Sequence, residues 1–331
     1  QKEGWLYRLD GEDGAPSAAA GETGPTVWLL LGGDQDGAAP ALAAALDATG
    51  ATTRQVPSAE VPDSPEAMAE LLRTFAAMAA GRAAGIVHLC GPDAASAATE
   101  TPADEAVQRR TFGTALALAQ ALAAERSRFN AAPRLWLITR NGAAVTDADP
   151  PTGIVQAGLW GFGRSLALEM PALWGGLIDL DASGDRPAEA ALMARQLRRP
   201  DGENQSALRG GRRLVARLAR VTPPLRTTRR EDGGTYIVTG GLGAIGRQVA
   251  EWLARQRKAE IIILVSRHGQ AAADAATVTR RIEALGPKVI IVKADTGNKA
   301  DVRRLMRRVR SLEPPLRGIY HSAGVIDDGL I

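Results

Sequence analysis

The strongest chemical signal in this sequence is a set of glycines spaced to hold a phosphate group. They lie in Thr239-Gly240-Gly241-Leu242-Gly243-Ala244-Ile245-Gly246, where the first, third and sixth residues after Gly240 form the pattern G-x-G-x-x-G. An apolar run, Tyr236–Thr239, precedes the turn and an amphipathic stretch, Ile245–Arg257, follows it, which is the strand–turn–helix setting of a dinucleotide-binding loop. We expect the pyrophosphate to meet the free N–H groups at the start of the helix. The alternative is a purely structural turn between strand and helix.

Each glycine of the pattern has its own expected task. Gly241 is expected to permit the tight turn out of the strand. Gly243, which has no Cβ, is expected to let the backbone approach the pyrophosphate. Gly246 is expected to let the helix pack close to the sheet. The turn therefore predicts a dinucleotide cofactor.

The end of the next strand indicates which dinucleotide is bound. An NAD site places Asp or Glu there to bind the ribose hydroxyls, about 20 residues after the glycines. Here the strand Ile261–Ser266 ends in Ser266 and Arg267, with no acid at its tip. An arginine at that point can pair with a 2′-phosphate through its planar fork of donors. The predicted cofactor is therefore NADPH, and the alternative is an ordinary surface arginine.

The first half of the chain has a related turn that lacks this chemistry. Gly32-Gly33-Asp34-Gln35-Asp36-Gly37 does not have the glycine spacing, and it puts two carboxylates where a phosphate would sit. Like charges there would repel the ligand. We predict that the first half binds no nucleotide and supports the second half structurally.

The elements that position these residues alternate between short aliphatic runs and longer amphipathic ones. This rhythm predicts an α/β fold with two Rossmann-like parallel-sheet subdomains, the first structural and degenerate and the second binding NADPH. The expected strands are Val27–Leu31, Ile86–Leu89, Leu135–Thr139, Gly176–Asp179, Tyr236–Thr239, Ile261–Ser266, Val289–Val292 and Gly318–His321. The expected helices are Ala38–Ala48, Pro65–Ala80, Ala103–Glu125, Thr152–Glu169, Ile245–Arg257, Ala272–Leu285 and Lys299–Arg310.

Residues 222–234 contain Pro-Pro and Gly-Gly and no apolar period, which is typical of a linker. We therefore expect a structural subdomain over 1–221 and a cofactor-binding one over 235–331. Residues 10–25 are expected to form a loop. The halves also resemble a distant repeat, because Gly85–Gly91 matches Gly318–Gly324 and Val27–Gly33 matches Tyr236–Gly241 in the same order.

Composition excludes several classes of protein. Lys and Arg number 40 and Asp and Glu 37, a net charge of +3, and they are interspersed, whereas a nucleic-acid binder shows a basic stripe. One cysteine, Cys90, and three histidines allow no internal disulfide and no familiar zinc cluster, so we expect no metal. No apolar run approaches the ~20 residues that cross a bilayer. The segment Gln1–Gly4 is neither a signal peptide nor a natural start, so we expect a cytoplasmic piece of a longer protein.

Several segments resemble one family. The second half is similar to short-chain dehydrogenase/reductases, and the whole chain is similar to the ketoreductase domain of a modular polyketide synthase. The segments that carry the resemblance to its structural subdomain are Leu6–Leu9, Pro151–Glu169 with Trp160-Gly161, Trp174–Leu180 with Trp174-Gly175-Gly176, and Ala207–Leu218. The resemblance implies a non-binding subdomain paired with a catalytic one that uses NADPH.

The resemblance also implies roles for residues after the later strands. Asp295-Thr296 would meet the adenine, and His321-Ser322-Ala323-Gly324 would lie beside the adenosine ribose. His321 could equally be a strand-end histidine satisfied by backbone. Ile326-Asp327-Asp328 resembles the Leu-Asp-Asp motif of B-type ketoreductases, whose product carries the D-configured hydroxyl, although an Asp pair could also cap a helix.

The family's catalytic residues have no counterpart here. The chemistry needs a tyrosine as general acid, a lysine and a serine, and the family places them beyond the Asp-Asp motif. The chain's tyrosines, Tyr7, Tyr236 and Tyr320, are each followed four places on by glycine, not by Lys or Asn. We therefore expect no catalytic residue in this chain, a sequence cut before them, and no turnover by the chain alone.

The intact domain would reduce a β-ketoacyl group, tethered to an acyl carrier protein, to a β-hydroxyacyl group within a multidomain synthase. Two other interpretations are open. The first is a scaffold region of an inactive ketoreductase, which the presence or absence of Tyr and Ser in the continuing sequence would decide. The second is a free-standing dinucleotide sensor, which has no need for a subdomain with Trp160-Gly161 and Trp174-Gly175.

Overall fold

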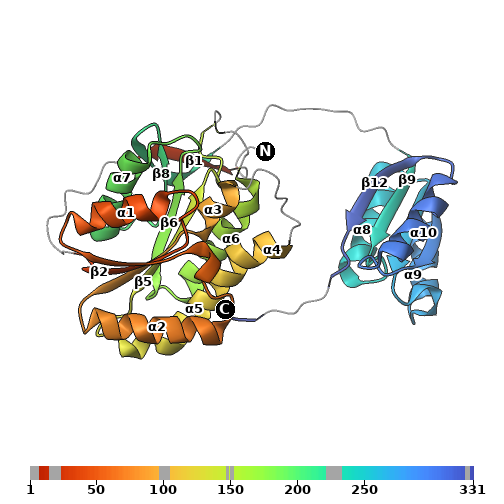
Figure 1. Ribbon diagram of the computed structural model, residues 1–331. Helices are drawn as coiled ribbons and strands as arrows, with labels where there is room; N and C mark the ends of the chain where they lie inside the picture. Colours follow the sequence, from red (N-terminus) through yellow and green to blue (C-terminus); the bar gives the residue numbers. More distant parts are fainter. Residues whose placement is uncertain are drawn as a thin grey trace. The chain divides into compact units, whose positions relative to one another are not determined.

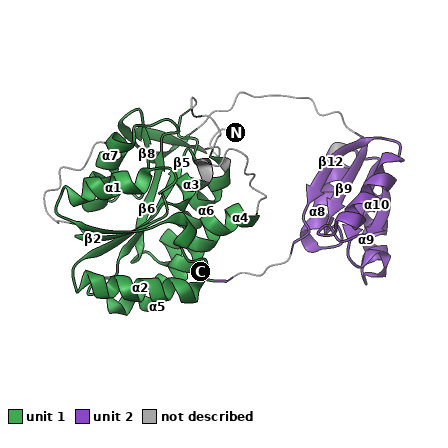
Figure 2. Ribbon diagram, in the orientation of Figure 1, with its two compact units in different colours: residues 1–223, 330–331 green, residues 224–329 purple. Residues whose placement is uncertain are grey.

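The computed structural model describes residues 7–14, 24–96, 105–146, 149, 153–220, 233–324 and 329–331. The chain divides into two compact units (Figure 2). Unit 1 comprises residues 1–223 with 330–331, and unit 2 comprises residues 224–329. The predicted linker at 222–234 lies outside the described residues except for its last two glycines.

Within its described residues, unit 1 forms an eight-stranded sheet in the order β1-β8-β7-β6-β5-β4-β2-β3. The strands from β3 to β7 pair in parallel, and β8 pairs antiparallel with both β7 and β1. The strands are β1 Tyr7–Asp13, β2 Val27–Leu31, β3 Thr52–Val56, β4 Ala84–His88, β5 Arg134–Arg140, β6 Trp174–Leu180, β7 Gln205–Arg209 and β8 Arg212–Arg220.

Helices cover both faces of this sheet (Figure 1). They are α1 Ala38–Asp47, α2 Pro65–Ala79, α3 Cys90–Ser96, α4 Glu105–Gln108, α5 Thr114–Glu125, α6 Ala157–Glu169 and α7 Arg186–Arg198. Alternate residues of β2 enter opposite cores: Leu29 packs with α2, α5 and α6, whereas Leu30 packs with α1 and α7. A strand buried on both faces in this way reads as a continuous apolar run, as β2 does.

Unit 2 is a smaller version of the same architecture. Its described residues form a parallel sheet in the order β11-β10-β9-β12. Its elements are β9 Thr235–Thr239, α8 Ala244–Arg257, β10 Ile261–Ser266, α9 Ala275–Glu283, β11 Lys288–Lys293, α10 Lys299–Arg310 and β12 Leu316–His321. Ile262 and Leu264 of β10 pack toward α8 and α9, and Ile263 packs toward α10. The expected fold class, two Rossmann-like parallel-sheet subdomains, is confirmed.

The structure differs from the sequence-based expectations in unit 1. Residues 10–13, expected to lie in a loop, continue β1, which pairs with β8. The helix expected over Ala103–Glu125 begins with the short α4, passes through a π-helical turn at Arg109–Gly113, and only then becomes α5. No described helix has the length and apolar character that spanning a bilayer requires.

Strand β3 and the helices α3 and α7 were not expected from the sequence, and for β3 and α7 the reason is physical. Strand β3 lies at the edge of the sheet and buries only Val56, so its sequence shows no apolar alternation. Helix α7 buries Glu189 and Gln196 on the face that an apolar period would mark. Their polar atoms are hydrogen-bonded inside the protein, so burial there does not require apolar side chains.

Candidate cofactor site

A cleft of about 570 Å³ lies in unit 2 at the carboxyl ends of its parallel strands. In open α/β sheets this edge is where ligands bind. The following residues predicted from the sequence line it together: Gly240, Leu242, Gly243, Ser266, Arg267, Asp295, Thr296, Ser322, Ala323 and Gly324. Four strands and the turns after them thus bring one set of predicted residues to a single cavity.

The glycine turn forms one wall of the cleft. The sequence places the tight turn at Gly241, but the left-handed residue is Gly240, with φ +63°. A Cβ on Gly240 would lie 2.7 Å from the carbonyl oxygen of Ser322, so the turn packs directly against the chain after β12. A Cβ on Gly246 would lie 2.2 Å from the carbonyl oxygen of Gly240. Glycine at 246 therefore lets helix α8 begin immediately against the turn.

The first turn of α8 supplies the donors that a phosphate needs. Gly243 is the residue that precedes the helix, and no side chain caps it. The first N–H groups of a helix have no intrahelical acceptor and carry the positive end of the helix dipole. A Cβ on Gly243 would meet only the carbonyl oxygen of Gly240, at 3.1 Å, so its other side is open. This arrangement can take an anionic group from the cleft.

Arg267 lies at the tip of β10 and also lines the cleft. Its side chain is exposed, and among the described residues no hydrogen bond or ion pair reaches its guanidinium group. By contrast, Arg247 of the same unit is paired with the carboxylate of Asp274, at 2.6 Å. Arg267 therefore has its full set of five donors available to a ligand.

Thr239, at the end of β9, binds the segment after β12 that lines the other side of the cleft. Its Oγ1 accepts from the N–H groups of Ser322 and Ala323, each at 3.2 Å, and lies 2.7 Å from Nδ1 of His321. The Thr239 hydroxyl therefore links His321 and the two residues after it to the end of β9. His321 is thus satisfied by a side chain, not by backbone, and it does not line the cleft.

The chain after β11 is ordered by its own hydrogen bonds. The Asp295 carboxylate accepts from the N–H of Gly297 at 2.9 Å, and the N–H of Asp295 donates to the carboxylate of Asp301 at 2.9 Å. The latter bond lowers the pKa of Asp301, with Arg304 adding to the effect. Asn298 caps α10 by accepting from the N–H groups of Ala300 and Asp301. This turn presents Asp295 and Thr296 to the cleft.

Some predicted residues do not line the cleft. Thr239, Gly241, Ala244, Ile245, Gly246 and His321 belong to the adjacent turns but are not among its lining residues. The predicted stereocontrol residues Ile326, Asp327 and Asp328 lie outside the described residues.

The sequence analysis missed five residues that build or support the site. Val265, His268, Ala272 and Ala294 line the cleft. Arg247 supports the glycine turn: its Nε donates to the carbonyl oxygen of Leu242 at 2.8 Å, and its Nη2 pairs with Asp274. His268 could have been predicted from the sequence, because it directly follows Arg267 at the end of β10.

Two of the three tyrosines pack in the core of unit 2. The Tyr236 and Tyr320 rings are 6.3 Å apart, and Trp252 meets Tyr320 edge-on at 6.0 Å. Neither tyrosine lines the cleft. Tyr7 belongs to β1 in unit 1. The described cleft can therefore hold a dinucleotide but contains no tyrosine to act as a general acid.

The fold and the cleft define a Rossmann-type dinucleotide-binding protein, and comparison with known proteins identifies its family. Residues 14–218 match the family described as "Polyketide synthase extender module SpnB, Rossmann fold domain", and residues 234–331 match the family described as "KR domain". The chain belongs to the ketoreductase domains of modular polyketide synthases. The resemblance seen in the sequence is thereby confirmed.

Individual relatives agree with this assignment. The chain is 34% identical over 341 residues to polyketide synthase GfsA of Streptomyces halstedii, covering 99% of this chain and 4% of that protein. It is 36% identical over 253 residues to erythronolide synthase EryA3 of Saccharopolyspora erythraea, covering 74% of this chain and 8% of that one. The chain thus spans a small fraction of the length of these synthases.

Solved ketoreductases share the fold. The first ketoreductase of the tylosin polyketide synthase has a TM-score of 0.75 at 28% identity, over 98% of this chain and 64% of that one. An A-type ketoreductase from a modular polyketide synthase has a TM-score of 0.71 at 33% identity, over 96% of this chain and 64% of that one.

Proposed function

We propose that this chain forms the NADPH-binding part of a ketoreductase that reduces a β-ketoacyl group to a β-hydroxyacyl group during polyketide synthesis. The observation that carries the proposal is the cleft of unit 2. In it, the glycine turn and the start of α8 form one side, and Arg267, without a partner among the described residues, stands at the tip of β10. The family to which the chain belongs supports the reaction class.

The residues present fit a phosphorylated dinucleotide. The N–H groups of Ala244 and Ile245 would bind the pyrophosphate, and the guanidinium group of Arg267 would bind the 2′-phosphate. Asp295 and Thr296 would contact the adenine, and the chain at Ser322–Gly324 would run beside the ribose. The bound nicotinamide supplies the hydride. The protein's part is to hold and orient the cofactor at the sheet edge.

The substrate would be a β-ketoacyl chain carried by phosphopantetheine on an acyl carrier protein, and other domains of the same synthase would be its neighbours. We propose a B-type product, with the D-configured hydroxyl, on the basis of Ile326-Asp327-Asp328 alone. Solved neighbours described as A1-type and C2-type share this fold, so configuration depends on local residues and not on the architecture. Chiral analysis of the hydroxyacyl product of the synthase would test this: an L-configured hydroxyl would contradict it.

We further propose that the 331-residue chain by itself does not reduce ketones. Tyr236 and Tyr320 are held in the aromatic cluster of unit 2 and neither lines the cleft, so no described tyrosine can protonate a developing alkoxide. Incubation of the chain with NADPH and a β-ketoacyl thioester should give no loss of absorbance at the nicotinamide band. Steady oxidation of NADPH that depends on the ketone would contradict this proposal.

The cofactor assignment is tested by titrating the chain with NADPH and with NADH and following nicotinamide fluorescence. A hydrogen-bonded charge pair contributes about 1.5–3 kcal/mol, so NADPH should bind roughly 10- to 100-fold more tightly than NADH. Arg267→Ala should remove this preference while leaving NADH binding unchanged. Arg303→Ala, an exposed arginine on α10 outside the cleft, is the matched control and should leave the preference intact.

Three results would contradict the assignment. Equal affinity of the wild-type chain for the two dinucleotides would exclude Arg267 as a 2′-phosphate ligand. An equal effect of Arg267→Ala and Arg303→Ala would show that only overall charge matters. Binding of neither dinucleotide would show that this cleft is not a cofactor site in the chain.

A further inference from the structure

The turn of unit 1 occupies the same place in its fold as the glycine turn of unit 2. In unit 1 the N–H of Leu89, directly after β4, donates to the carbonyl oxygen of Leu31 at the end of β2, at 2.7 Å. In unit 2 the N–H of Ser322, directly after β12, donates to the carbonyl oxygen of Thr239 at the end of β9, at 3.2 Å. Strand β2 beside β4 and strand β9 beside β12 therefore place their turns in corresponding positions.

The glycines that follow these strands have matching surroundings. Gly32 has φ +75°, and a Cβ on it would lie 2.8 Å from Sγ of Cys90. Gly240 has φ +63°, and a Cβ on it would lie 2.9 Å from Ala323. Both glycines thus let the turn pack against the second residue after the neighbouring strand. The Gly32–Gly37 turn is therefore the structural counterpart of the dinucleotide loop.

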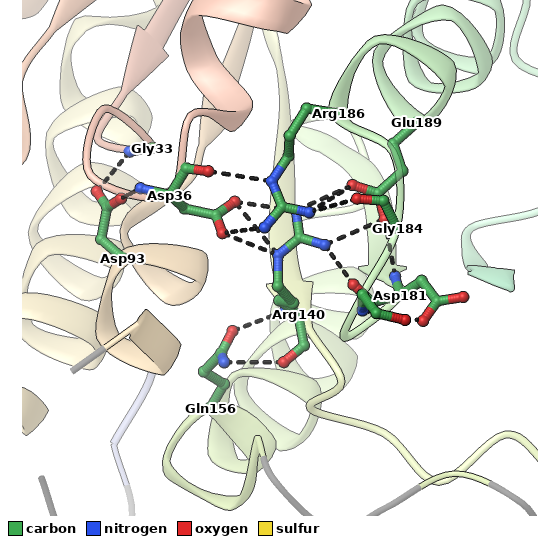
Figure 3. Close-up of polar contacts among 10 residues, drawn as sticks. Gly33, Asp36, Asp93, Arg140, Gln156, Asp181, Gly184, Arg186 and Glu189 are labelled. Atoms are coloured by element: carbon green, nitrogen blue, oxygen red, sulfur yellow. Dashed lines mark hydrogen bonds and ion pairs between the residues drawn. The ribbon is translucent and has the colours of Figure 1, made fainter. Parts of the chain in front are cut away.

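A carboxylate of unit 1 occupies the main-chain donors of its turn (Figure 3). Oδ2 of Asp93 accepts from the N–H of Gly33 at 2.6 Å, and Oδ1 accepts from the N–H of Asp36 at 2.8 Å. The hydroxyl of Ser58 also donates to this carboxylate. Asp93 is 6% exposed and belongs to α3, the helix that follows β4. Main-chain N–H groups that converge on one anion are also what binds phosphate in anion-binding turns.

The two aspartates of the turn differ in how far their charges are balanced: Asp36 has cationic partners, whereas Asp34 is exposed and its charge helps to raise the pKa of Asp93. Asp36 pairs with Arg140 at 2.9 Å and with Arg186 at 3.0 Å, and Glu189 completes the cluster shown in Figure 3. Asp34 accepts from the N–H of Ser58 at 2.7 Å. The charge of Asp36 is therefore balanced inside the protein, and a different group decides what the turn can bind.

We propose that the Gly32–Gly37 turn is an oxyanion site whose ligand is the protein's own Asp93 carboxylate. The turn offers two main-chain donors, the N–H groups of Gly33 and Asp36, and a tethered carboxylate fills them at a high effective concentration that no free anion matches. Burial raises the pKa of Asp93, while the hydroxyl of Ser58 and the N–H groups of Asp36 and Gly33 act against that rise by binding the charged form. The N–H groups of Gly33 and Asp36 thus have an acceptor without any external anion.

The proposal predicts that removing the carboxylate opens a site for a small oxyanion. Asp93→Ala should lower the Tm of unit 1, and sodium formate should restore it, with a rise that grows with the logarithm of formate concentration above saturation. Sodium chloride at equal ionic strength provides the baseline. The ¹³C resonance of formate should broaden with Asp93→Ala and not with the wild-type chain.

Two controls separate this site from general effects. Asp34→Ala removes an equal charge from an exposed position of the same turn, and Ser206→Ala removes a buried neutral hydroxyl that bonds to Gln196. Neither should gain stability from formate beyond the wild-type chain. If Asp93→Ala does not fold in chloride, folding in formate supports the proposal, and failure to fold in formate overturns it. An equal response of Asp93→Ala and either control also overturns it.

Discussion

Arg140 lies at the centre of the buried ionic cluster of unit 1, and its removal should be one of the most damaging single changes in the chain. Its Nη2 lies 2.9 Å from the Asp36 carboxylate and 3.0 Å from the Glu189 carboxylate, and the three side chains are 5%, 3% and 7% exposed. Burial disfavours the charged form, yet hydrogen bonds and charges from Glu189 and Asp36 keep the pKa of Arg140 above its ordinary value. Asp36 and Glu189 therefore stabilise the positive charge of the buried Arg140 guanidinium group.

The expected cost follows from which charges remain buried after Arg140→Met. Removing one partner of a buried ion pair costs about 3–5 kcal/mol, because the remaining charge is left uncompensated. Arg186 still pairs with Asp36 at 3.0 Å and approaches Glu189 at 3.4 Å, so we expect the lower end, about 3 kcal/mol. For a unit of this size that corresponds to a fall in Tm of about 6–12 °C.

Urea unfolding followed by tryptophan fluorescence measures this cost. Five of the six tryptophans lie in residues 1–223 and only Trp252 lies in unit 2, so the signal reports mainly on unit 1. The matched control is Arg134→Met at the exposed start of the same strand, β5, which should change stability by less than about 0.5 kcal/mol.

A further variant tests the cause of the loss. Asp36→Asn and Glu189→Gln added to Arg140→Met remove the unpaired charges and should recover part of the stability. Arg140→Met costing no more than Arg134→Met would refute the reasoning. So would a triple variant less stable than Arg140→Met alone.

Three other predictions concern single sites. Gly246→Ala should abolish dinucleotide binding, because its Cβ would lie 2.2 Å from the carbonyl oxygen of Gly240. Gly161→Ala, where a Cβ meets nothing within 4 Å in helix α6, should instead raise unfolding free energy by up to about 1 kcal/mol and leave binding unchanged. Thr239→Val should destabilise unit 2 by about 1–3 kcal/mol and weaken dinucleotide binding, because the N–H of Ala323 loses its acceptor and the N–H of Ser322 keeps only the carbonyl oxygen of residue 239; Thr239→Ser should retain both stability and binding, and equal losses in the two variants would contradict this. His88 is buried and its pKa is lowered to about 4, so below pH 6.5 the unfolded chain binds a proton that the folded chain does not. Its contribution should fall by up to about 1.4 kcal/mol per pH unit from roughly pH 6 to 4, and His88→Gln should flatten this part of a stability–pH curve; an unchanged slope would contradict it.

Local patterns in the sequence were sufficient to predict the strands, the helices and the glycine turn of unit 2. The glycine spacing, the apolar strands on either side and Arg267 after β10 each act over a few residues, so propensity, period and turn chemistry indicate them without knowledge of the rest. Strands β2 and β10 and helix α10 appear at their predicted bounds. The parallel order of the strands then brings their carboxyl ends to one edge, which is why separated turns were expected to meet.

Tertiary structure decided which polar groups find partners. Asp93 reaches the amides of a turn 60 residues earlier, and Arg140 pairs with Asp36 at a separation of 104 residues. From the sequence, the carboxylate of Asp36 was expected to repel a ligand, and the helix α7 was not expected at all. The structure pairs Asp36 with two arginines and buries Glu189 of α7 beside them. The free energy of a buried charge depends on the groups that surround it in space, and those come from distant parts of the chain.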